Sequence, residues 1–417
     1  MAPGGVPRPT GRGWGVVVAG LALVAVGALV ESPPLVFAGA SLTALVLAVV
    51  ASLLVRSADV SVGRRFSPSR GVAGGGTVET LAVTLRSGRR QHVSVTEQLP
   101  WLGARSRSRA VPVVLEPGRA SSAVLRHADL PRGRHRVGPL HLELVESFGV
   151  ARRRVVAPGT VELVVVPEAV DLGLARESRS LGDGARRQRE HSLSGGEDDP
   201  ITREYRRGDP MRRVHWKATA RHGELMVRQE EQHGLPSARL VLATASAGWA
   251  DASSGADAAT SDSFEWALSV VATLGVEWGH AGSVVALSTP GGDLVARHDP
   301  EATGSWLEAL ADLRLDDVVD AVAAPTAARE PVTAVVSGLT RAELDQLGHV
   351  RAAGSSAVAL VVSPTLGFAA VGGSDPRGVV GPDVVAETLR GSGWRVVEAD
   401  PREPVGAVVR RGGLLDG

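Results

Sequence analysis

The chain has 417 residues, which is enough for two or three domains. Its 45 basic and 45 acidic side chains balance, so it lacks the overall positive charge that draws proteins to nucleic acid, and no nucleic-acid partner is expected. The absence of cysteine excludes disulfides, thiol catalysis and cysteine-ligated zinc.

Two apolar segments without charged residues, at residues 14–30 and 35–55, open the chain. A helix needs about 20 apolar residues to cross a bilayer, with about 17 as the short limit. The connection Glu31-Ser32-Pro33-Pro34 allows only a tight turn, and its prolines suit a helix break and restart. Residues 1–57 are therefore predicted to form a transmembrane hairpin with both ends on one side.

The flanking charges orient this hairpin, because basic residues precede the first segment and follow the second while the turn has none. These residues are Arg8, Arg12, Arg56, Arg64 and Arg65. The positive-inside rule then places residues 56–417 in the cytoplasm, beneath the cell membrane.

Two other interpretations of the apolar segments remain. A cleaved signal peptide is one, because Ala38-Gly39-Ala40 resembles a cleavage site, although the second segment would still anchor the chain. Two buried core helices are the other, and they are disfavoured because neither segment has a polar face.

Residues 58–171 contain short runs of Val, Leu and Thr, several of which alternate apolar and polar residues as half-buried strands do. Gly- and Arg-rich turns separate the runs, a pattern typical of a β-sandwich of roughly seven strands. No acid/base constellation is apparent in this domain. The predicted strands include residues 78–85, 92–96, 111–115, 140–145 and 161–166.

Strands and helices alternate in residues 237–417, which predicts a doubly wound α/β domain whose parallel sheet is covered on both faces. Ligands in such folds bind at the carboxyl ends of strands. The loop after the first strand, residues 243–248, has neither a Gly-rich phosphate motif nor a carboxylate. The stretch with Asp251, Ser253 and Asp257 is predicted to be a flexible surface loop. Further predicted elements are strands at 283–287, 332–336, 357–362 and 394–398 and helices at 264–278, 304–313, 341–347 and 382–390.

The chain's rarest residue types gather in the linker between these domains, residues 172–236. Its only lysine, tyrosine and isoleucine lie between Ile201 and Met226. Lys217 is a single lysine among many arginines. The two residue types are not interchangeable in a fitted site, because the lysine side chain ends in a compact ammonium group and the arginine side chain in a planar guanidinium.

The segment at residues 195–231 resembles the signature of the DUF58 family (domain of unknown function 58). The motif positions are Arg203, Tyr205, Gly208, Asp209, Arg212, Val214, Trp216, Lys217, Ala220 and Arg221. The resemblance implies a C-terminal domain similar to the von Willebrand factor A fold. It also implies association with MoxR-type AAA+ ATPases and transglutaminase-like membrane proteins.

The metal-binding version of that fold carries Asp-x-Ser-x-Ser after its first strand, and the matching positions here are Ala243, Ala245 and Ala247. The metal site is thus expected to be degenerate. No metal, no cofactor and no catalytic residue is predicted, since the histidines are scattered without metal-ligand spacing and no nucleophile–base pair is visible.

Three interpretations of the signature remain open. The first is an interdomain clasp, with Trp216 and Val214 facing inward and Arg–carboxylate pairs outside. The second is a docking surface for a partner, since Trp, Tyr and Arg are enriched at binding hot spots. The third is a phosphate site around Lys217. The favoured function is a membrane-anchored cytoplasmic scaffold or adaptor that engages a protein partner such as a MoxR-type ATPase. The alternatives are a metal-dependent adhesion module, a phosphate- or nucleotide-binding regulator, and an enzyme acting on envelope material.

Overall fold

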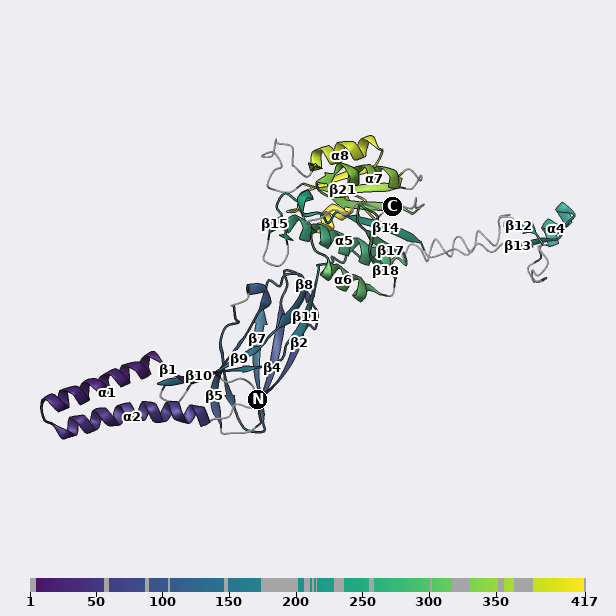
Figure 1. Cartoon of the computed structure of the whole chain (residues 1–417). Coiled ribbons are helices and arrows are strands. Elements are labelled where there is room, and N and C mark those ends of the chain that lie inside the picture. Colours follow the sequence, from purple (N-terminus) through teal and green to yellow (C-terminus); the bar gives the residue numbers. More distant parts are fainter. Residues whose placement is uncertain are drawn as a thin grey trace. The chain divides into compact units, whose positions relative to one another are not determined.

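The structure is a computed structural model that describes residues 5–55, 60–86, 90–103, 106–145, 149–173, 202–205, 211, 214, 216–228, 236–254, 259–300, 302–316, 330–351, 356–363 and 378–415. The chain divides into two compact units (Figure 1). The first comprises Met1–Glu168 with Leu310–Leu313, and the second Ala169–Ala309 with Arg314–Gly417.

The first unit begins with an antiparallel helical hairpin. Helix α1 spans Gly11–Leu29 and helix α2 spans Pro33–Val55, and both are long and apolar enough to cross a membrane. Helix α1 begins earlier than expected because the Thr10 hydroxyl accepts a hydrogen bond from the Gly13 amide (3.2 Å) and so caps the helix. Helix α2 begins at a proline, whose fixed φ and missing N–H suit the first helical turn.

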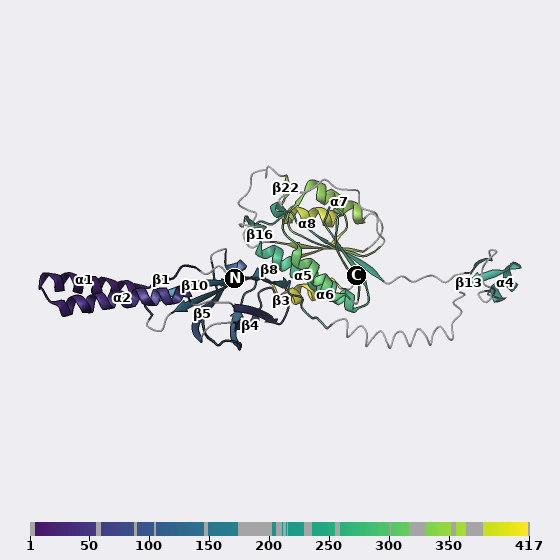
Figure 2. The ribbon, with the colours of Figure 1, turned by 60° about the horizontal axis from the view of Figure 1, so that its bottom comes forward.

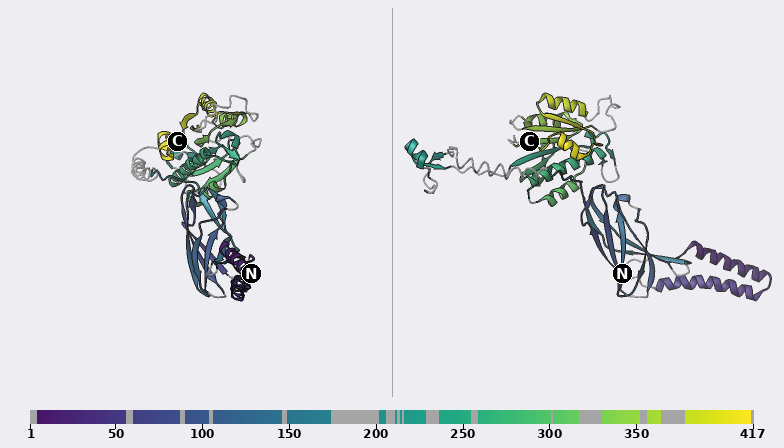
Figure 3. Two further views of the ribbon diagram at one scale, coloured as in Figure 1. Left: turned by 90° about the vertical axis from the view of Figure 1, so that its left-hand side faces the viewer. Right: turned by 180° about the vertical axis from the view of Figure 1, so that it is seen from behind.

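Glycines let the two helices of the hairpin approach closely. A Cβ added at Gly20 would lie 2.8 Å from the Gly39 carbonyl oxygen, and one at Gly39 would lie 2.4 Å from the Gly20 carbonyl oxygen. Gly13, Gly20 and Gly27 are the buried residues of α1 and recur every seven positions; Gly20 and Gly27 face α2, whereas Gly13 faces the Val150 backbone beside β10. Small residues at helix interfaces permit this packing where lipid supplies no hydrophobic driving force. The two helices lie side by side in both views of Figure 3.

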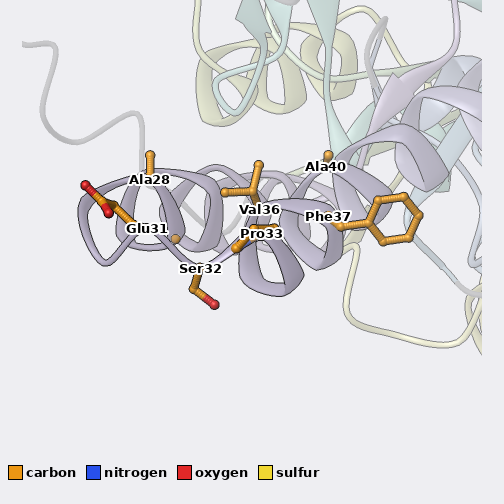
Figure 4. Close-up of a pocket in the computed structure, with 8 residues that line it drawn as sticks. Ala28, Glu31, Ser32, Pro33, Val36, Phe37 and Ala40 are labelled. Carbon is orange, nitrogen blue, oxygen red and sulfur yellow. The ribbon is translucent and has the colours of Figure 1, made fainter.

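An open apolar hollow lies where the hairpin turns (Figure 4). Gly27 and Pro33 leave the space, and the Phe37 ring points away from the helices and is 77% exposed. Glu31 at the turn adopts a positive φ of 53°. This hollow is lined almost wholly by carbon and offers few polar groups to a soluble ligand.

Three sheets follow the hairpin in the first unit. The largest has the order β1-β10-β9-β5-β6, and the others have the orders β2-β4-β7 and β3-β11-β8. Their bounds are β1 Arg8–Pro9, β2 Val60–Ser67, β3 Gly71–Val72, β4 Thr77–Leu85, β5 Gln91–Glu97, β6 Val111–Leu115, β7 Ala120–His127, β8 Gly133–Val137, β9 Leu140–Val145, β10 Ala151–Ala157 and β11 Val161–Val166.

Alternation of side chains along these strands builds one shared core. In β4 the residues Leu81, Val83 and Leu85 are fully buried, while the residues between them are less buried or exposed. They pack with Val95 of β5 and Leu142 of β9, so the inward faces of two sheets meet. A second apolar cluster joins β2, β8 and β11.

Both ends of the hairpin attach to strand β10. The residues before α1 form β1, which pairs antiparallel with β10, and the Thr10 amide donates to the Val150 carbonyl (2.9 Å). At the end of α2, Leu53 packs with Val150 and Ala151, and its carbonyl accepts from Arg153 Nη1 (2.9 Å). The start of α1 and the end of α2 are therefore held at the same strand.

The second unit contains a six-stranded sheet of order β18-β17-β14-β19-β21-β23. All neighbours are parallel except the edge strand β18, which is antiparallel to β17. The strands are β14 Ser237–Leu242, β17 Val284–Ser288, β18 Leu294–His298, β19 Val332–Val336, β21 Ala357–Val362 and β23 Arg395–Ala399. Short strand pairs join β15 Ser253–Ser254 to β16 Ala259–Thr260, and β20 Leu339–Thr340 to β22 Val379–Val380.

Helices cover this sheet. Helices α7 (Arg341–Arg351) and α8 (Pro382–Gly391) pack on it through Leu347 and Val385, and α5 (Asp262–His280) lies on the other side (Figure 2). Helices α6 (Thr303–Asp312) and α9 (Val405–Arg411) complete the set. Strands β19 and β21 are buried along their whole length, as expected for near-continuous Val, Ala and Leu.

One expectation for this unit is wrong. Asp251 is not part of a flexible loop, because its Oδ1 accepts from the Ser261 hydroxyl (2.6 Å) and its Oδ2 from the Ser263 amide (2.9 Å) at the start of α5. Asp257 lies outside the described residues.

Candidate functional site

The signature residues form a small element of two strands and a helix. Strand β12 (Thr202–Glu204) pairs antiparallel with β13 (Met226–Arg228), and α4 (Trp216–His222) lies between them in sequence. The pairing extends to Tyr205, whose amide donates to the Leu225 carbonyl (2.8 Å). Val214 forms a further bridge to Val227.

A short apolar interior and a side-chain hydrogen bond hold this element together. Val214, Ala218 and Val227 are its buried side chains, at 8%, 5% and 1% exposure. The Thr219 hydroxyl accepts from the Met226 amide (3.0 Å), which ties the helix to β13. Gly223 ends the helix at a φ of +79°, a conformation that favours glycine.

Trp216 faces outward with 66% of its surface exposed, so the expectation that it packs inward is wrong, while the inward position of Val214 is confirmed. Residues two apart on a helix point about 200° apart, since each advances by about 100°. Ala218 occupies the buried position, and Trp216 therefore projects to the opposite side.

The signature residues that follow this tryptophan on α4 are exposed as well. Lys217, Ala220 and Arg221 are exposed, and Lys217 and Arg221 lie four residues apart on one helix face. Arg221 and His222 are in the last helical turn, where basic groups complement the helix dipole.

Strand β12 carries Arg203, whose backbone is in register with Val227, and Tyr205 after it is half-buried. Gly208, Asp209 and Arg212, by contrast, lie outside the described residues.

A family model described as a protein of unknown function, DUF58, matches residues 201–367. The match begins at this element and continues past β21, so the family model covers both the β12–α4–β13 element and most strands of the α/β sheet. We refer to residues 201–228 as the DUF58 element. A search of curated proteins finds no match.

Three solved structures show partial likeness. The CARDB domain of a Pyrococcus furiosus protein in complex with di-metal ions is 12% identical over 26% of this chain and 88% of that chain, with a TM-score of 0.19. The Pseudomonas fluorescens alkylpurine DNA glycosylase AlkC bound to DNA is 14% identical over 32% and 38%, at 0.19. Cwp6 from Clostridium difficile is 7% identical over 82% and 45%, at 0.13. At these TM-scores none of the three assigns a fold or a function to the chain.

The carboxyl end of strand β14 is filled by protein. Ala243 and Ala245 are buried there, and Trp249, which is 2% exposed, donates from its indole nitrogen to the Ala243 carbonyl (3.2 Å). Gly248 packs so closely that an added Cβ would lie 2.3 Å from the Gly338 carbonyl oxygen. Within the described residues no group of three acidic or histidine side chains could hold a metal ion.

A cluster of ionisable side chains lies buried in the β-rich part of the first unit. We call Arg64, Glu79, Glu97 and His127 the buried charge cluster; their side chains are 3%, 0%, 0% and 2% exposed. Arg64 Nη2 donates to Glu97 Oε1 (3.1 Å), and His127 Nε2 lies 2.9 Å from Glu79 Oε2. The Trp101 ring meets the His127 ring edge-on at 5.6 Å.

Burial makes the charge on Glu97 costly. Loss of hydration, helped by the nearby Glu79 carboxylate, raises the pKa of Glu97 from 4.5 to about 7, although Arg64 opposes the change. Its second oxygen, Oε2, has no hydrogen-bond partner among the described residues. A neutral Glu97 therefore suits this site near neutral pH.

This cluster is absent from the predictions made from the sequence, although the alternation of residues along the strands indicates it. Glu79 shares the inward parity of Leu81 and Val83, and Glu97 that of Val93 and Val95. His127 follows Ala123 and Leu125 in the same way. Because the side chains are closed off from solvent, the cluster supports the β fold and offers no access to a substrate.

Proposed function

We propose that the chain is a membrane-anchored cytoplasmic scaffold or adaptor whose DUF58 element docks a protein partner, with a MoxR-type AAA+ ATPase as the first candidate. The supporting observation is the exposed Trp216 beside Lys217 and Arg221 on α4. Trp and Arg dominate binding hot spots, because they combine large apolar area with directional polar groups. A transglutaminase-like membrane protein is a second candidate partner.

Anchoring rests on the two apolar helices and their flanking arginines. The bilayer would take up the outward side chains of the hairpin, such as Phe37. Positive residues at both ends of the hairpin favour the cytoplasmic side for the rest of the chain.

We further propose that the second unit is a von Willebrand factor A-like domain that has lost its metal site. Its parallel sheet with one antiparallel edge strand supports the fold. The alanines at 243, 245 and 247 replace the three oxygen-bearing residues of the metal motif, and the buried Trp249 donates to the Ala243 carbonyl at the strand end. A metal-dependent adhesion module is therefore disfavoured.

The clasp and phosphate interpretations are weaker than docking. A clasp rests on an inward Trp216, whereas Val214, Ala218 and Val227 form the interior of the described part of the element and Trp216 is exposed there. A phosphate site would rest on the basic residues of α4, a helix of only seven residues with no Gly-rich loop before it.

The test is a binding measurement on detergent-solubilised full-length protein with the purified MoxR-type ATPase of the same organism. We expect Trp216→Ala to weaken binding by about thirtyfold or more, the loss that marks a hot-spot residue. Leu294→Ala is the matched control, since Leu294 is also 66% exposed but lies on β18. Lys217→Ala should weaken binding less, and Lys217→Arg should show whether the ammonium itself is needed.

Two results would count against docking. If Trp216→Ala folds and binds as tightly as the wild type, the exposed tryptophan is not the contact. If the Leu294→Ala control weakens binding equally, the loss is not specific to the DUF58 element.

A further inference from the structure

We propose that the base of the hairpin is a binding surface for anionic phospholipid headgroups, formed by Arg8, Arg12, Arg152 and Arg154. We call these four residues the basic collar. The inference rests on the proposed membrane anchoring and adds to it a preference for lipid charge.

Strand β1, helix α1 and strand β10 bring the four arginines of the collar together at the base of the hairpin. Arg8 lies in β1, directly before α1, and its Cα is in register with that of Arg152 in β10 (Figure 1). The Arg12 guanidinium reaches Gly149, since Nη1 would lie 3.8 Å from a Cβ added there. The end of α2 is held at the same strand, because Arg153 donates to the Leu53 carbonyl.

That level coincides with the expected membrane surface. Helix α1 has 19 residues, and at 1.5 Å per residue it spans roughly 28 Å, close to the thickness of a bilayer core. Trp14, in its first turn, is 58% exposed, and tryptophan favours the interface between headgroups and acyl chains. Arg8 and Arg12 precede Trp14 and so lie at headgroup depth, together with the start of β10.

The charges of the collar are incompletely neutralised by protein. Arg8 and Arg152 are directly opposed like charges, an arrangement that destabilises a strand pair unless an anion lies near. Glu143 contacts both Arg152 (3.1 Å) and Arg154 (3.5 Å). Among the described residues no ion pair involves Arg8 or Arg12, and residues 5–15 and 149–157 contain no acidic side chain.

Phospholipid phosphates supply the missing negative charge. Arg binds phosphate through paired N–H donors, and the four side chains are exposed. A lipid headgroup fits better than a soluble anion, because the collar surrounds the point where both helices enter the bilayer and meets headgroups at high local concentration.

The test uses full-length protein in nanodiscs of phosphatidylcholine that contain a spin-labelled lipid, either phosphatidylglycerol or phosphatidylcholine. Electron paramagnetic resonance measures the fraction of label immobilised at the protein. We expect a preference for phosphatidylglycerol of about fivefold, the effect of one basic residue at the surface, and 0.5 M KCl should reduce it. The variant Arg8→Gln/Arg12→Gln/Arg152→Gln should abolish the preference and leave phosphatidylcholine association unchanged.

Two further variants keep the result interpretable. Arg8→Lys/Arg12→Lys/Arg152→Lys retains the charge and should retain most of the preference. Arg297→Gln/Arg390→Gln removes exposed arginines from the second unit and should change nothing.

Equal association of the two lipids with the wild type would overturn the proposal, as would a preference that survives the triple glutamine variant. Abolition of the preference by glycerol phosphate at millimolar concentration would also overturn it, because the collar would then be a site for soluble phosphate. Failure of the protein to enter the nanodiscs at all would instead contradict the proposed membrane anchoring.

Discussion

The buried charge cluster makes a prediction about stability and pH. Glu97→Gln replaces a buried carboxyl with a neutral amide of nearly the same shape, and the amide oxygen can still accept the hydrogen bond from Arg64 Nη2. The wild-type pKa of Glu97 is raised from 4.5 to about 7, chiefly by burial. Between these two pH values the native state holds a proton that the unfolded chain has released.

The sign follows from that proton. The contribution of Glu97 to the free energy of unfolding of the wild type falls as pH rises from 4.5 to about 7 and is constant above and below this window. The gap between the two pKa values corresponds to about 3 kcal/mol, all of which the wild type has lost by pH 8. The variant lacks the titrating group and should not lose it.

Hydrogen exchange of full-length protein, followed by mass spectrometry, measures this locally. The slowest amides of β4 and β5, corrected for intrinsic exchange rates, report the free energy of opening at pH 5 and at pH 8. We expect the difference between Glu97→Gln and wild type to shift by about 2.5 kcal/mol in favour of the variant between the two pH values, because pH 5 already lies inside the titration window. Glu116→Gln, at an exposed turn, is the control and should track the wild type. A difference that stays constant from pH 5 to pH 8 would refute the reasoning.

Three more predictions follow from packing and capping. Gly39→Ile should separate the hairpin helices, since even a Cβ there would lie 2.4 Å from the Gly20 carbonyl oxygen. Disulfide cross-linking between cysteines introduced at Val24 and Ala40 should therefore fall. The control substitution Ala44→Ile should leave the cross-linking unchanged. Asp251→Ala should destabilise the second unit by about 1 kcal/mol, measured by denaturant unfolding, because two donors at the start of α5 lose their acceptor. Val227→Ala, which empties part of the interior of the DUF58 element, should raise the protease sensitivity of α4 at least severalfold, and the exposed substitution Met211→Ala should not.

Much of the secondary structure follows from sequence pattern alone. Strands β19 and β21 occur at the predicted residues, because continuous runs of Val, Ala and Leu that are buried on both faces leave little ambiguity. The edge strand β18 and the terminal helix α9 were missed, since LVARH is short and half exposed and VGAVVRR combines glycine with β-branched residues.

Side-chain direction was harder to predict than element type. Trp216 was expected inside on its hydrophobicity, yet the small Ala218 takes the buried position of a short helix. The buried charges were overlooked because charged residues are usually exposed, although strand parity placed Glu79 and Glu97 inward. Hydrophobicity alone gave the wrong side-chain direction both for Trp216 and for the buried glutamates. The position of each residue within its helix or strand predicts the observed direction.

The docking role of the DUF58 element is tested most directly by photo-crosslinking in intact cells. A photoreactive phenylalanine analogue in place of Trp216 captures whatever lies within a few ångströms of that side chain in the native membrane. The proposal predicts a crosslink to the MoxR-type ATPase, and none from the same probe at Leu294 of β18. Crosslinks from position 216 that stay entirely within the chain would contradict docking and establish the DUF58 element as an interdomain clasp.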